Sequence, residues 1–502
     1  MSGAARAAAE GLETPTGRGA VHHAGTRVRG LVAASPSTQV WSAFTVSLAL
    51  ALVVAFSSGV HSFSYGDSAS YWALGLTFIK HGSFSFTSFK SPTWGYVFPL
   101  YDLVLHEVAQ TLGLSALAII RISNCLIVAA LATSVVPRMA HTIWPDLSFN
   151  FVRRVVVTAL FLVFWRGWLD FSLTDFLGLL LLIMALSFLA TSRSILRYLL
   201  AGVFTALACN IRPSYLPVLI VMALLVVRNF SSVGTSTEGA RTTRRIVVSG
   251  GRRAALCVGA FILGLILVSF PQAWLNHTHY ETWSPVAGAP GKVDLVELDD
   301  GMLYQRFESV VIAHAAAAIV YPDPSTSKLL HTLPGREITG YGEYLRVVVR
   351  HPLVMVGAFG RRLINGFDVH YSTPYTPHII APPDWLDLAS CTVCFLALLR
   401  LLHKRSRRLL GRMDGIYLAS LVLLCVTSLP TLIEPRFMLT GDVIAYALCV
   451  APGWRTNVLD TGSSELLRLR WRTIVIVTGA YVLWLAVWFS VIGTALGSYR
   501  IP

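Results

Sequence analysis

Three short polar stretches interrupt the long apolar runs of this chain, and each carries a side chain that can do chemistry. Asp67 lies in YGDSASYWALG, Arg212 lies in CNIRPSYL, and Glu434 and Arg436 lie in TLIEPRFMLTG. A carboxylate can take the proton of a hydroxyl group as a general base. Guanidinium groups can hold a phosphate and stabilise the charge on it as it leaves. Converging on one cavity, these residues would suit transfer of a group from a phosphorylated donor to a hydroxyl acceptor.

The composition predicts a polytopic membrane protein. Of 502 residues, 54% are hydrophobic and only 13% are charged, whereas a soluble protein of this length carries roughly 25% charged residues. Many apolar runs approach the roughly 20 residues that cross a bilayer as a helix. The formal net charge of +14 does not indicate nucleic-acid binding, because the arginines form short clusters between apolar runs. Few lysines and abundant alanine are typical of a high-GC bacterial genome.

The apolar runs predict eleven transmembrane helices joined by loops of contrasting charge. With the N-terminus in the cytoplasm, the arginine-rich loops lie inside and most acidic residues outside, as the positive-inside rule requires. The C-terminus is then outside, in a multi-pass protein of the cell inner (plasma) membrane. The predicted spans are 40–60, 116–137, 155–169, 173–191, 197–211, 213–228, 254–275, 385–402, 415–433, 437–452 and 473–493.

Residues 93–113 tempt assignment as a twelfth span. Asp102, His106 and Glu107 would then lie near the bilayer centre, where each carboxylate costs roughly 2.5–3.5 kcal/mol on insertion scales. That span would also place the arginines of the next loop outside. We therefore expect 93–113 to form an amphipathic helix along the outer interface.

The predicted organisation is asymmetric, with two long outer loops, 61–115 and 276–384. Interfacial helices are expected in both, at 68–81 and 341–366 among others. Binding and catalysis are expected in these loops and in the short turns that face them. The chain divides into a disordered cytoplasmic tail, a transmembrane module, and a cytoplasmic loop followed by the last helix, at 1–39, 40–452 and 453–502.

The candidate residues also have simpler interpretations. Asp67 can be a solvated loop residue, Glu434 can pair with Arg436 or another charge, and Arg212 can cap a helix or snorkel to the interface. However, an arginine at the outer membrane boundary runs against the charge bias and needs a partner. From the residues alone, both interpretations remain open.

In order and topology these features resemble the GT-C superfamily of integral-membrane glycosyltransferases. Members use polyprenyl-phosphate sugars and include protein O-mannosyltransferases and lipid A aminoarabinose transferases. In the first outer loop, the family's order of an acid, an aromatic, a Lys-Pro-Pro-like element, Leu-Gly and an arginine is similar to the order found here: Asp67, Tyr71-Trp72, Lys90-Ser91-Pro92, Leu112-Gly113 and Arg121. IRPSYLP resembles an Arg-Pro element between helices five and six, and EPRF resembles a Glu-x-Arg-aromatic element of a late outer turn.

The resemblance implies an all-α GT-C-like fold, with Asp67 as the catalytic base and Arg436 and Arg212 on the donor phosphate. It implies sugar transfer, with inversion, from a polyprenyl-phosphate donor to a cell-envelope glycan, glycolipid or protein hydroxyl. The bilayer is a further partner and nucleic acid is not one. Residues of possible support are Glu434, Asp175, Lys90, Tyr71, His351 and Arg306.

Several of these supporting residues have an equally simple role. Asp175 could be a second acid of the site or a charge favoured by a helix N-terminus, and Asp170 is expected to be a solvated turn residue. Arg306 and His351 could contact the donor or acceptor, or be solvated charges of the outer loop. The aromatic Tyr375 could stack on a sugar or lie at the interface.

A metal is possible but not favoured. Ser68 follows Asp67 where many family members have a second acid, and Ser91 follows Lys90 where the family pattern has proline, which also puts the role of Lys90 in doubt. His277 and His279 lack an evident third ligand. Cys391 and Cys394 form a C-x-x-C within an apolar run, where packing is the expected role. No metal ligand and no cofactor is assigned.

Three other functions remain open. A transporter or flippase of a lipid-linked sugar is disfavoured, because no paired repeats or matched broken helices are evident. A non-catalytic scaffold predicts that Asp67 and Arg436 do not meet. A polymerase or ligase of lipid-linked glycans would differ only in its donor.

Overall fold

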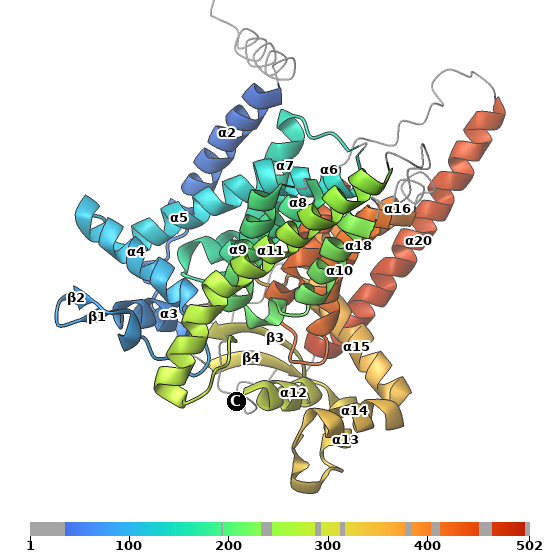
Figure 1. The fold of residues 1–502 in the computed structure, drawn as a ribbon. Coiled ribbons are helices and arrows are strands. Elements are labelled where there is room, and N and C mark those ends of the chain that lie inside the picture. Colours follow the sequence, from blue (N-terminus) through green and yellow to red (C-terminus); the bar gives the residue numbers. More distant parts are fainter. Residues whose placement is uncertain are drawn as a thin grey trace, which may run out of the picture.

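The computed structural model is largely helical, and Figure 1 shows a helical bundle with a smaller domain at one end. It describes residues 36–145, 147–191, 194–231, 243–286, 293–311, 317–376, 384–402, 412–450 and 464–496. The tail predicted at 1–39 lies outside the described residues, except that Pro36 already begins a helix.

Every predicted span coincides wholly or largely with a helix. These helices are α2 (Pro36–Phe56), α5 (Ala116–Ala130) continued through the π-turn η2 (Leu131–Val135) into α6 (Val136–Ile143), α7 (Phe151–Trp165), α8 (Thr174–Thr191), α9 (Ile195–Ile211), α10 (Val218–Ser231), α11 (Thr243–Tyr280), α16 (Asp384–Leu402), α18 (Arg412–Thr427), α19 (Leu439–Cys449) and α20 (Ser464–Leu496).

Five helical stretches within the described residues are long and apolar enough to cross a membrane: Ser37–Phe56, Ala116–Ile143, Arg252–Tyr280, Trp385–Leu402 and Thr473–Ile492. They indicate a membrane-embedded helical protein. The count of eleven spans stays a prediction, because several of the other apolar helices are shorter.

Close helix packing holds α9, the helix that leads to Arg212, against α11. A Cβ on Gly202 would lie 2.1 Å from the carbonyl oxygen of Phe261, and one on Gly264 would lie 2.3 Å from that of Leu199. Two glycines at the crossing therefore let the backbones touch, which is a common way to associate helices in membranes.

The first outer loop folds against the end of α9. It contains α3 (Gly66–Leu76), a small hairpin of β1 (Ile79–Lys80) and β2 (Ser83–Phe84), η1 (Phe86–Ser88) and α4 (Val97–Leu112). The backbone N–H of Val97 donates to the side-chain oxygen of Asn210 at 3.0 Å, and a Cβ on Gly95 would lie 2.3 Å from the carbonyl of Asn210. This contact fixes the loop beside Arg212.

The segment 93–113 contains α4. We expected its acids to lie at the membrane interface, but one of them, Asp102, is buried. Asp102 is 1% exposed and accepts a hydrogen bond from the hydroxyl of Ser172. Its second oxygen has no hydrogen-bond partner among the described residues. Burial raises the pKa of Asp102 to about 8, so this side of α4 faces protein rather than water.

The buried Asp102 predicts an unusual pH dependence of stability. An unfolded aspartate releases its proton near pH 3.9, whereas the folded protein retains it up to about pH 8. The unfolded state therefore binds fewer protons in this window, and stability falls as pH rises through it, by up to about 1.4 kcal/mol per pH unit. Asp102→Asn should flatten this dependence in thermal unfolding of the purified protein between pH 4 and 9. Glu107→Gln, on the exposed side of α4, should leave the wild-type slope intact, and an unchanged slope in Asp102→Asn would contradict the assignment.

The second long loop forms a domain over residues 293–376, called the outer domain after the side on which the sequence predicts it, and this domain includes a sheet the sequence did not predict. Strand β3 (Tyr304–Val311) pairs antiparallel with β4 (Ala317–Pro322) and parallel with β5 (Tyr375–Thr376). Around the sheet lie α12 (Val293–Leu303), α13 (Pro324–Leu330), η7 (Pro334–Arg336), α14 (Tyr341–Arg350) and α15 (Pro352–Phe367).

The helix expected at 341–366 is broken in two. His351 adopts non-helical angles before Pro352, where α15 begins. A proline disfavours the helical conformation of the residue before it and lacks the N–H that would continue the helix.

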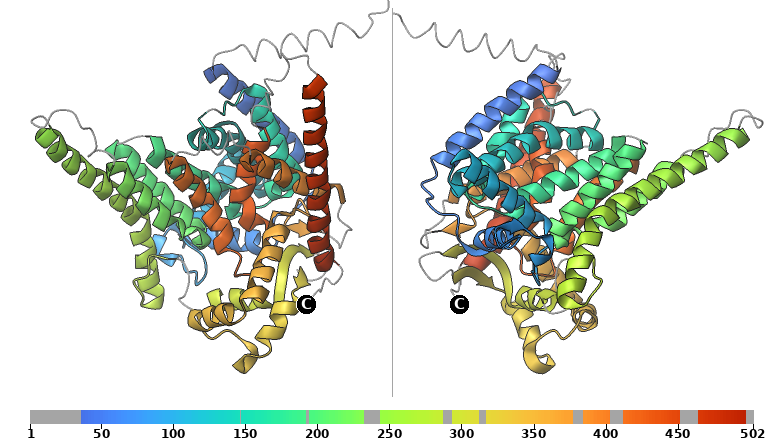
Figure 2. Two further views of the ribbon diagram at one scale, coloured as in Figure 1. Left: turned by 90° about the vertical axis from the view of Figure 1, so that its right-hand side faces the viewer. Right: turned by 60° about the vertical axis from the view of Figure 1, so that its left-hand side comes forward.

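Both long loops lie at the same end of the bundle. Figures 1 and 2 show α3, β1 and β2 on the side where β3, β4 and α12–α15 gather, and α20 reaches that end. Any site shared by the two loops therefore lies at this end of the helices.

Candidate active site

Arg436 joins two acids that the sequence had placed on one face. Its guanidinium donates to Glu434 through Nη2 at 3.0 Å, and to Oδ2 of Asp67 through Nη1 at 3.1 Å, across 369 residues of sequence. The Asp67 side chain is 37% exposed, against 20% for Arg436 and 19% for Glu434. Asp67 is thus the acid of this group most open to an incoming molecule.

Local structure sets the position of each of these side chains. Asp67 lies in the first turn of α3, where a negative charge is favoured by the helix dipole. Pro435 begins the short helix η8 (Pro435–Met438), with Glu434 in the extended conformation before it. Proline at the first helical position sets the turn, so Glu434 and Arg436 are held close enough to pair.

A second arginine lies beside this group, with its own acid. Arg212 follows the last residue of α9 and forms an ion pair with Asp175, in the first turn of α8; both side chains are buried. The Arg212 guanidinium lies 5.6 Å from the centre of the Phe437 ring, and that of Arg436 lies 5.8 Å from the same ring. Phe437 thus brings the two cations to one place.

Tyr71 completes the cluster on the side of α3. It lies one turn beyond Asp67, is buried, and packs on Trp94 and Phe98 with ring centres 5.0 Å apart in each case. Burial, followed by the nearby charge of Asp67, raises the pKa of Tyr71. The phenol is therefore a neutral hydrogen-bond donor.

The structure thus assembles six of the nine predicted site residues: Asp67, Arg436, Arg212, Glu434, Asp175 and Tyr71. Phe437 was part of the EPRF element but was not named as a site residue. The aromatic after Arg436 was the available signal. Glu434 pairs with Arg436, as its simpler interpretation expected. Asp175 lies in the first turn of α8, as its simpler interpretation expected, and in addition it pairs with Arg212.

The other three predicted residues lie elsewhere. Lys90 is exposed and its ammonium lies over the ring of Tyr280 at 5.9 Å. His351 is exposed at the break between α14 and α15. Arg306 is fully buried in a different group of charges. In the part of the chain that the structure describes, none of these three forms a hydrogen bond or ion pair with Asp67 or Arg436.

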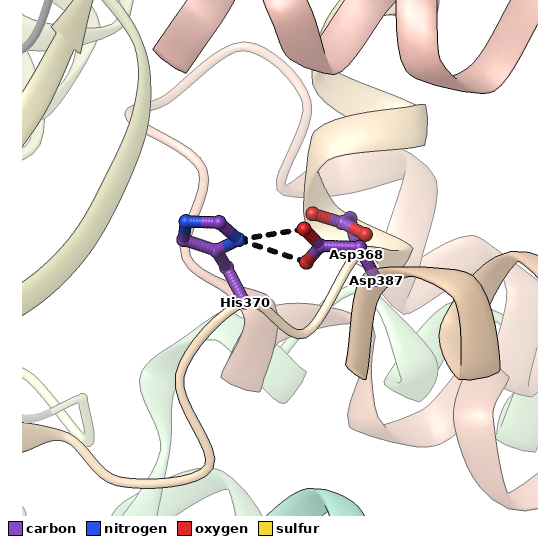
Figure 3. A group of neighbouring side chains, drawn as sticks. All are labelled: Asp368, His370 and Asp387. Atoms are coloured by element: carbon purple, nitrogen blue, oxygen red, sulfur yellow. Dashed lines mark hydrogen bonds and ion pairs between the residues drawn. The ribbon is translucent and has the colours of Figure 1, made fainter. Parts of the chain in front are cut away.

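Arg306 anchors a buried network between the outer domain and the bundle. It pairs with Glu308 and, at 2.7 Å, with Asp368, which also accepts from the indole N–H of Trp488 in α20 at 3.2 Å. His370 Nδ1 lies 2.8 Å from a carboxylate oxygen of Asp387 in α16. Figure 3 shows the His370 imidazole facing Asp387, with Asp368 beside it.

This network also contains the described side chains best suited to hold a metal. One donor atom each from Asp368, His370 and Asp387 lies within 4.8 Å of the others, and all three residues are buried. Two carboxylates and an imidazole are ligands that divalent cations accept. Asp368 already binds Arg306 and Trp488, and His370 faces Asp387, so the network is also consistent with a purely structural junction.

Removing the cation from this junction should be costly. Arg306→Met leaves the carboxylates of Glu308 and Asp368 buried beside each other without their arginine, and breaking a buried pair in this way costs about 3–5 kcal/mol. Chemical unfolding of the purified protein should show that loss, whereas Arg346→Met, on the exposed side of α14, should change little. The double variant Arg306→Met/Asp368→Asn should be more stable than the single variant; equal stability would argue against the ion pair as the cause.

Asp170, which the sequence predicts to lie in a solvated turn, lies instead inside the protein. It is fully buried and pairs with Arg121 Nε at 2.7 Å. Arg121 also donates to the Ser58 hydroxyl and the Val60 carbonyl. The arginine that opens the second predicted span therefore ties three segments together rather than entering the candidate site.

The two histidines of NHTHY have separate contacts. His277 stacks on Trp283 with ring centres 4.4 Å apart, and His279 lies 2.9 Å from the carbonyl oxygen of Thr87. Cys391 is buried within α16. Within the described ranges these residues form no metal-binding group.

Sequence comparisons assign no family to the chain. No protein-family model matches it, and no curated protein matches it. Functional inference therefore rests on the geometry around Asp67 and Arg436.

Proposed function

We propose that this protein is a membrane glycosyltransferase of GT-C type that uses a polyprenyl-phosphate sugar donor. The observation that carries the proposal is the contact of Asp67 with Arg436, with Arg212 across the shared Phe437 ring. An accessible carboxylate and two cations held beside each other suit base-assisted transfer from a phosphate leaving group. The same contact counts against a non-catalytic scaffold.

The donor phosphate would take the place of Asp67 at Arg436. Three of the five guanidinium N–H groups face Glu434 and Asp67, and the remaining two, together with the one released by Asp67, can bind phosphate oxygens. Arg212 adds positive charge nearby, while Asp175 and Glu434 keep both cations oriented. Binding the donor would thus free the base and hold the leaving group in one event.

Transfer would then proceed by in-line displacement. Asp67 takes the proton of the acceptor hydroxyl as its oxygen forms a bond to the anomeric carbon. The bond between that carbon and the phosphate oxygen breaks, and its electron pair stays on the polyprenyl phosphate. The two arginines stabilise this charge, and inversion at the anomeric carbon follows from the geometry.

The location of the cluster fits a lipid-linked donor. It lies at the end of the bundle that carries both long loops, where the polyprenyl tail can enter the bilayer between helices while the sugar stays in water. We place this end outside the plasma membrane, with the N-terminus cytoplasmic, and take a cell-envelope glycan, glycolipid or protein hydroxyl as acceptor.

The deciding experiment is a transfer assay with purified protein and a panel of polyprenyl-phosphate sugars, with and without chelator. The proposal requires transfer from at least one of these donors. Transfer only from a diphosphate-linked glycan would favour a polymerase or ligase. Movement of a lipid-linked sugar across vesicles without any transfer would favour a flippase.

A further inference from the structure

One segment runs from the buried network of the outer domain to the Asp67 cluster. This cluster consists of Asp67, Tyr71, Asp175, Arg212, Glu434 and Arg436. This segment, residues 368–376, begins at the ion pair of Asp368 with Arg306 and contains His370, which faces Asp387 (Figure 3). It ends in strand β5, which pairs with β3. Both of its ends are therefore held by the outer domain.

The middle of the segment is attached to the bundle. The backbone N–H of Gly167 donates to the Ser372 carbonyl at 2.8 Å, and Arg166 Nε donates to the Ser372 hydroxyl at 3.0 Å. A Cβ on Gly167 would lie 2.3 Å from Thr373, so only glycine permits this approach. The segment is thus fixed on the turn between α7 and α8.

Tyr375 then reaches the N-terminus of α3. Its hydroxyl lies against the first turn of α3, near the backbone N–H groups of Asp67 and Ser68. Gly66 has a φ of +46°, and a Cβ there would lie 2.7 Å from the hydroxyl oxygen. Tyr375 is 7% exposed, and its ring packs edge-on against Phe171 with centres 4.7 Å apart.

The first N–H groups of α3 receive no hydrogen bond from the side chain of its own capping residue. The first N–H groups of a helix have no partner within the helix and are usually satisfied by the side chain of the capping residue. The capping residue of α3 is Tyr65, which makes no such hydrogen bond. The Tyr375 hydroxyl, from a distant part of the chain, lies against Gly66 at the position where such a cap is needed.

We propose that Tyr375 is a positioning residue that holds Asp67 in its catalytic geometry by capping α3 from the outer domain. This inference rests on the proposed function, because it assigns Tyr375 to the base of that reaction. The hydroxyl lies at the backbone of the first turn of α3, whereas the Asp67 carboxylate is paired with Arg436, so Tyr375 acts on the position of the base rather than on the donor. A displacement of about 1 Å at a reacting group can cost about 100-fold in rate.

Tyr375→Phe keeps the ring and removes only the hydroxyl. We expect kcat to fall about 10- to 100-fold while KM for the polyprenyl-phosphate sugar stays within about twofold, because both arginines remain. Tyr321→Phe removes a hydroxyl from another buried tyrosine of the outer domain and should leave both constants unchanged. A wild-type kcat in Tyr375→Phe would overturn the proposal. A rise in KM as large as the expected fall in kcat would also overturn it.

Two further variants separate positioning from folding. In an Asp67→Asn background, Tyr375→Phe should cause no additional loss of the residual rate, because the residue acts only through Asp67; a further tenfold loss would contradict this. If Tyr375→Phe is not recovered folded, Gly66→Ala perturbs the same contact from α3 and should reproduce the loss of kcat. Wild-type activity of Asp67→Asn would instead reject the proposed function itself.

Discussion

Asp67→Asn should reduce sugar transfer by about 100- to 10,000-fold, the usual contribution of a general base, while the protein remains folded and inserted. Asparagine has nearly the shape of aspartate and can still accept the hydrogen bond that Arg436 Nη1 makes at 3.1 Å. It cannot take a proton from an acceptor hydroxyl at neutral pH. The measurement is kcat with the purified variant and saturating donor and acceptor, beside thermal unfolding.

Glu107→Gln is a matched control for the loss of one outer-face carboxylate. Glu107 lies exposed on α4 in the same outer loop and should keep wild-type activity. Near-normal transfer by Asp67→Asn would reject Asp67 as the base. A loss of activity that accompanies a loss of folded protein would point to a structural role.

Arg436→Lys should lower kcat/KM for the donor by about 100- to 1,000-fold, the usual effect of removing one group that stabilises a developing negative charge. Lysine keeps the positive charge but cannot face Glu434 and Asp67 at once with a planar fork of donors. Both the rise in KM and the fall in kcat are expected, because the guanidinium is proposed to bind the phosphate and to stabilise it as it leaves. Steady-state kinetics with varied donor measure both.

In Arg436 variants, the loss of stability can be separated from the loss of sugar transfer. Glu434 is partly buried beside Arg436, so loss of the cation also leaves an unpaired acid. The double variant Arg436→Met/Glu434→Gln removes both charges and should recover stability but not transfer. Recovery of transfer would show that Arg436 serves only as the partner of Glu434, and Arg350→Lys on the exposed face of α14 should be silent throughout.

The helices were predictable because their signal is local. A run of apolar residues reports its own burial or lipid exposure wherever the chain leads, so each predicted span overlaps a helix of the structure. The two long loops were predictable for the same reason, since they are the longest stretches between the apolar runs.

The sheet of the outer domain shows where such local signals fail. In β3, alternate positions hold Arg306 and Glu308, and both side chains are fully buried and paired. A buried ion pair has the sequence pattern of a solvated strand face or loop, because charge normally indicates exposure. Asp170 and Asp102 were misjudged in the same way, as acids that the fold encloses.

By itself, the sequence determined the apolar helices and the types of residue able to do chemistry at their ends. The tertiary structure decided which of those residues meet. Arg436 pairs with Asp67 across 369 residues, Arg212 pairs with Asp175, and Arg306 lies in a buried junction. Tyr375 packs against the first turn of the helix that carries Asp67. Composition and periodicity report the surroundings of single segments, whereas ion pairs between distant segments depend on the path of the whole chain.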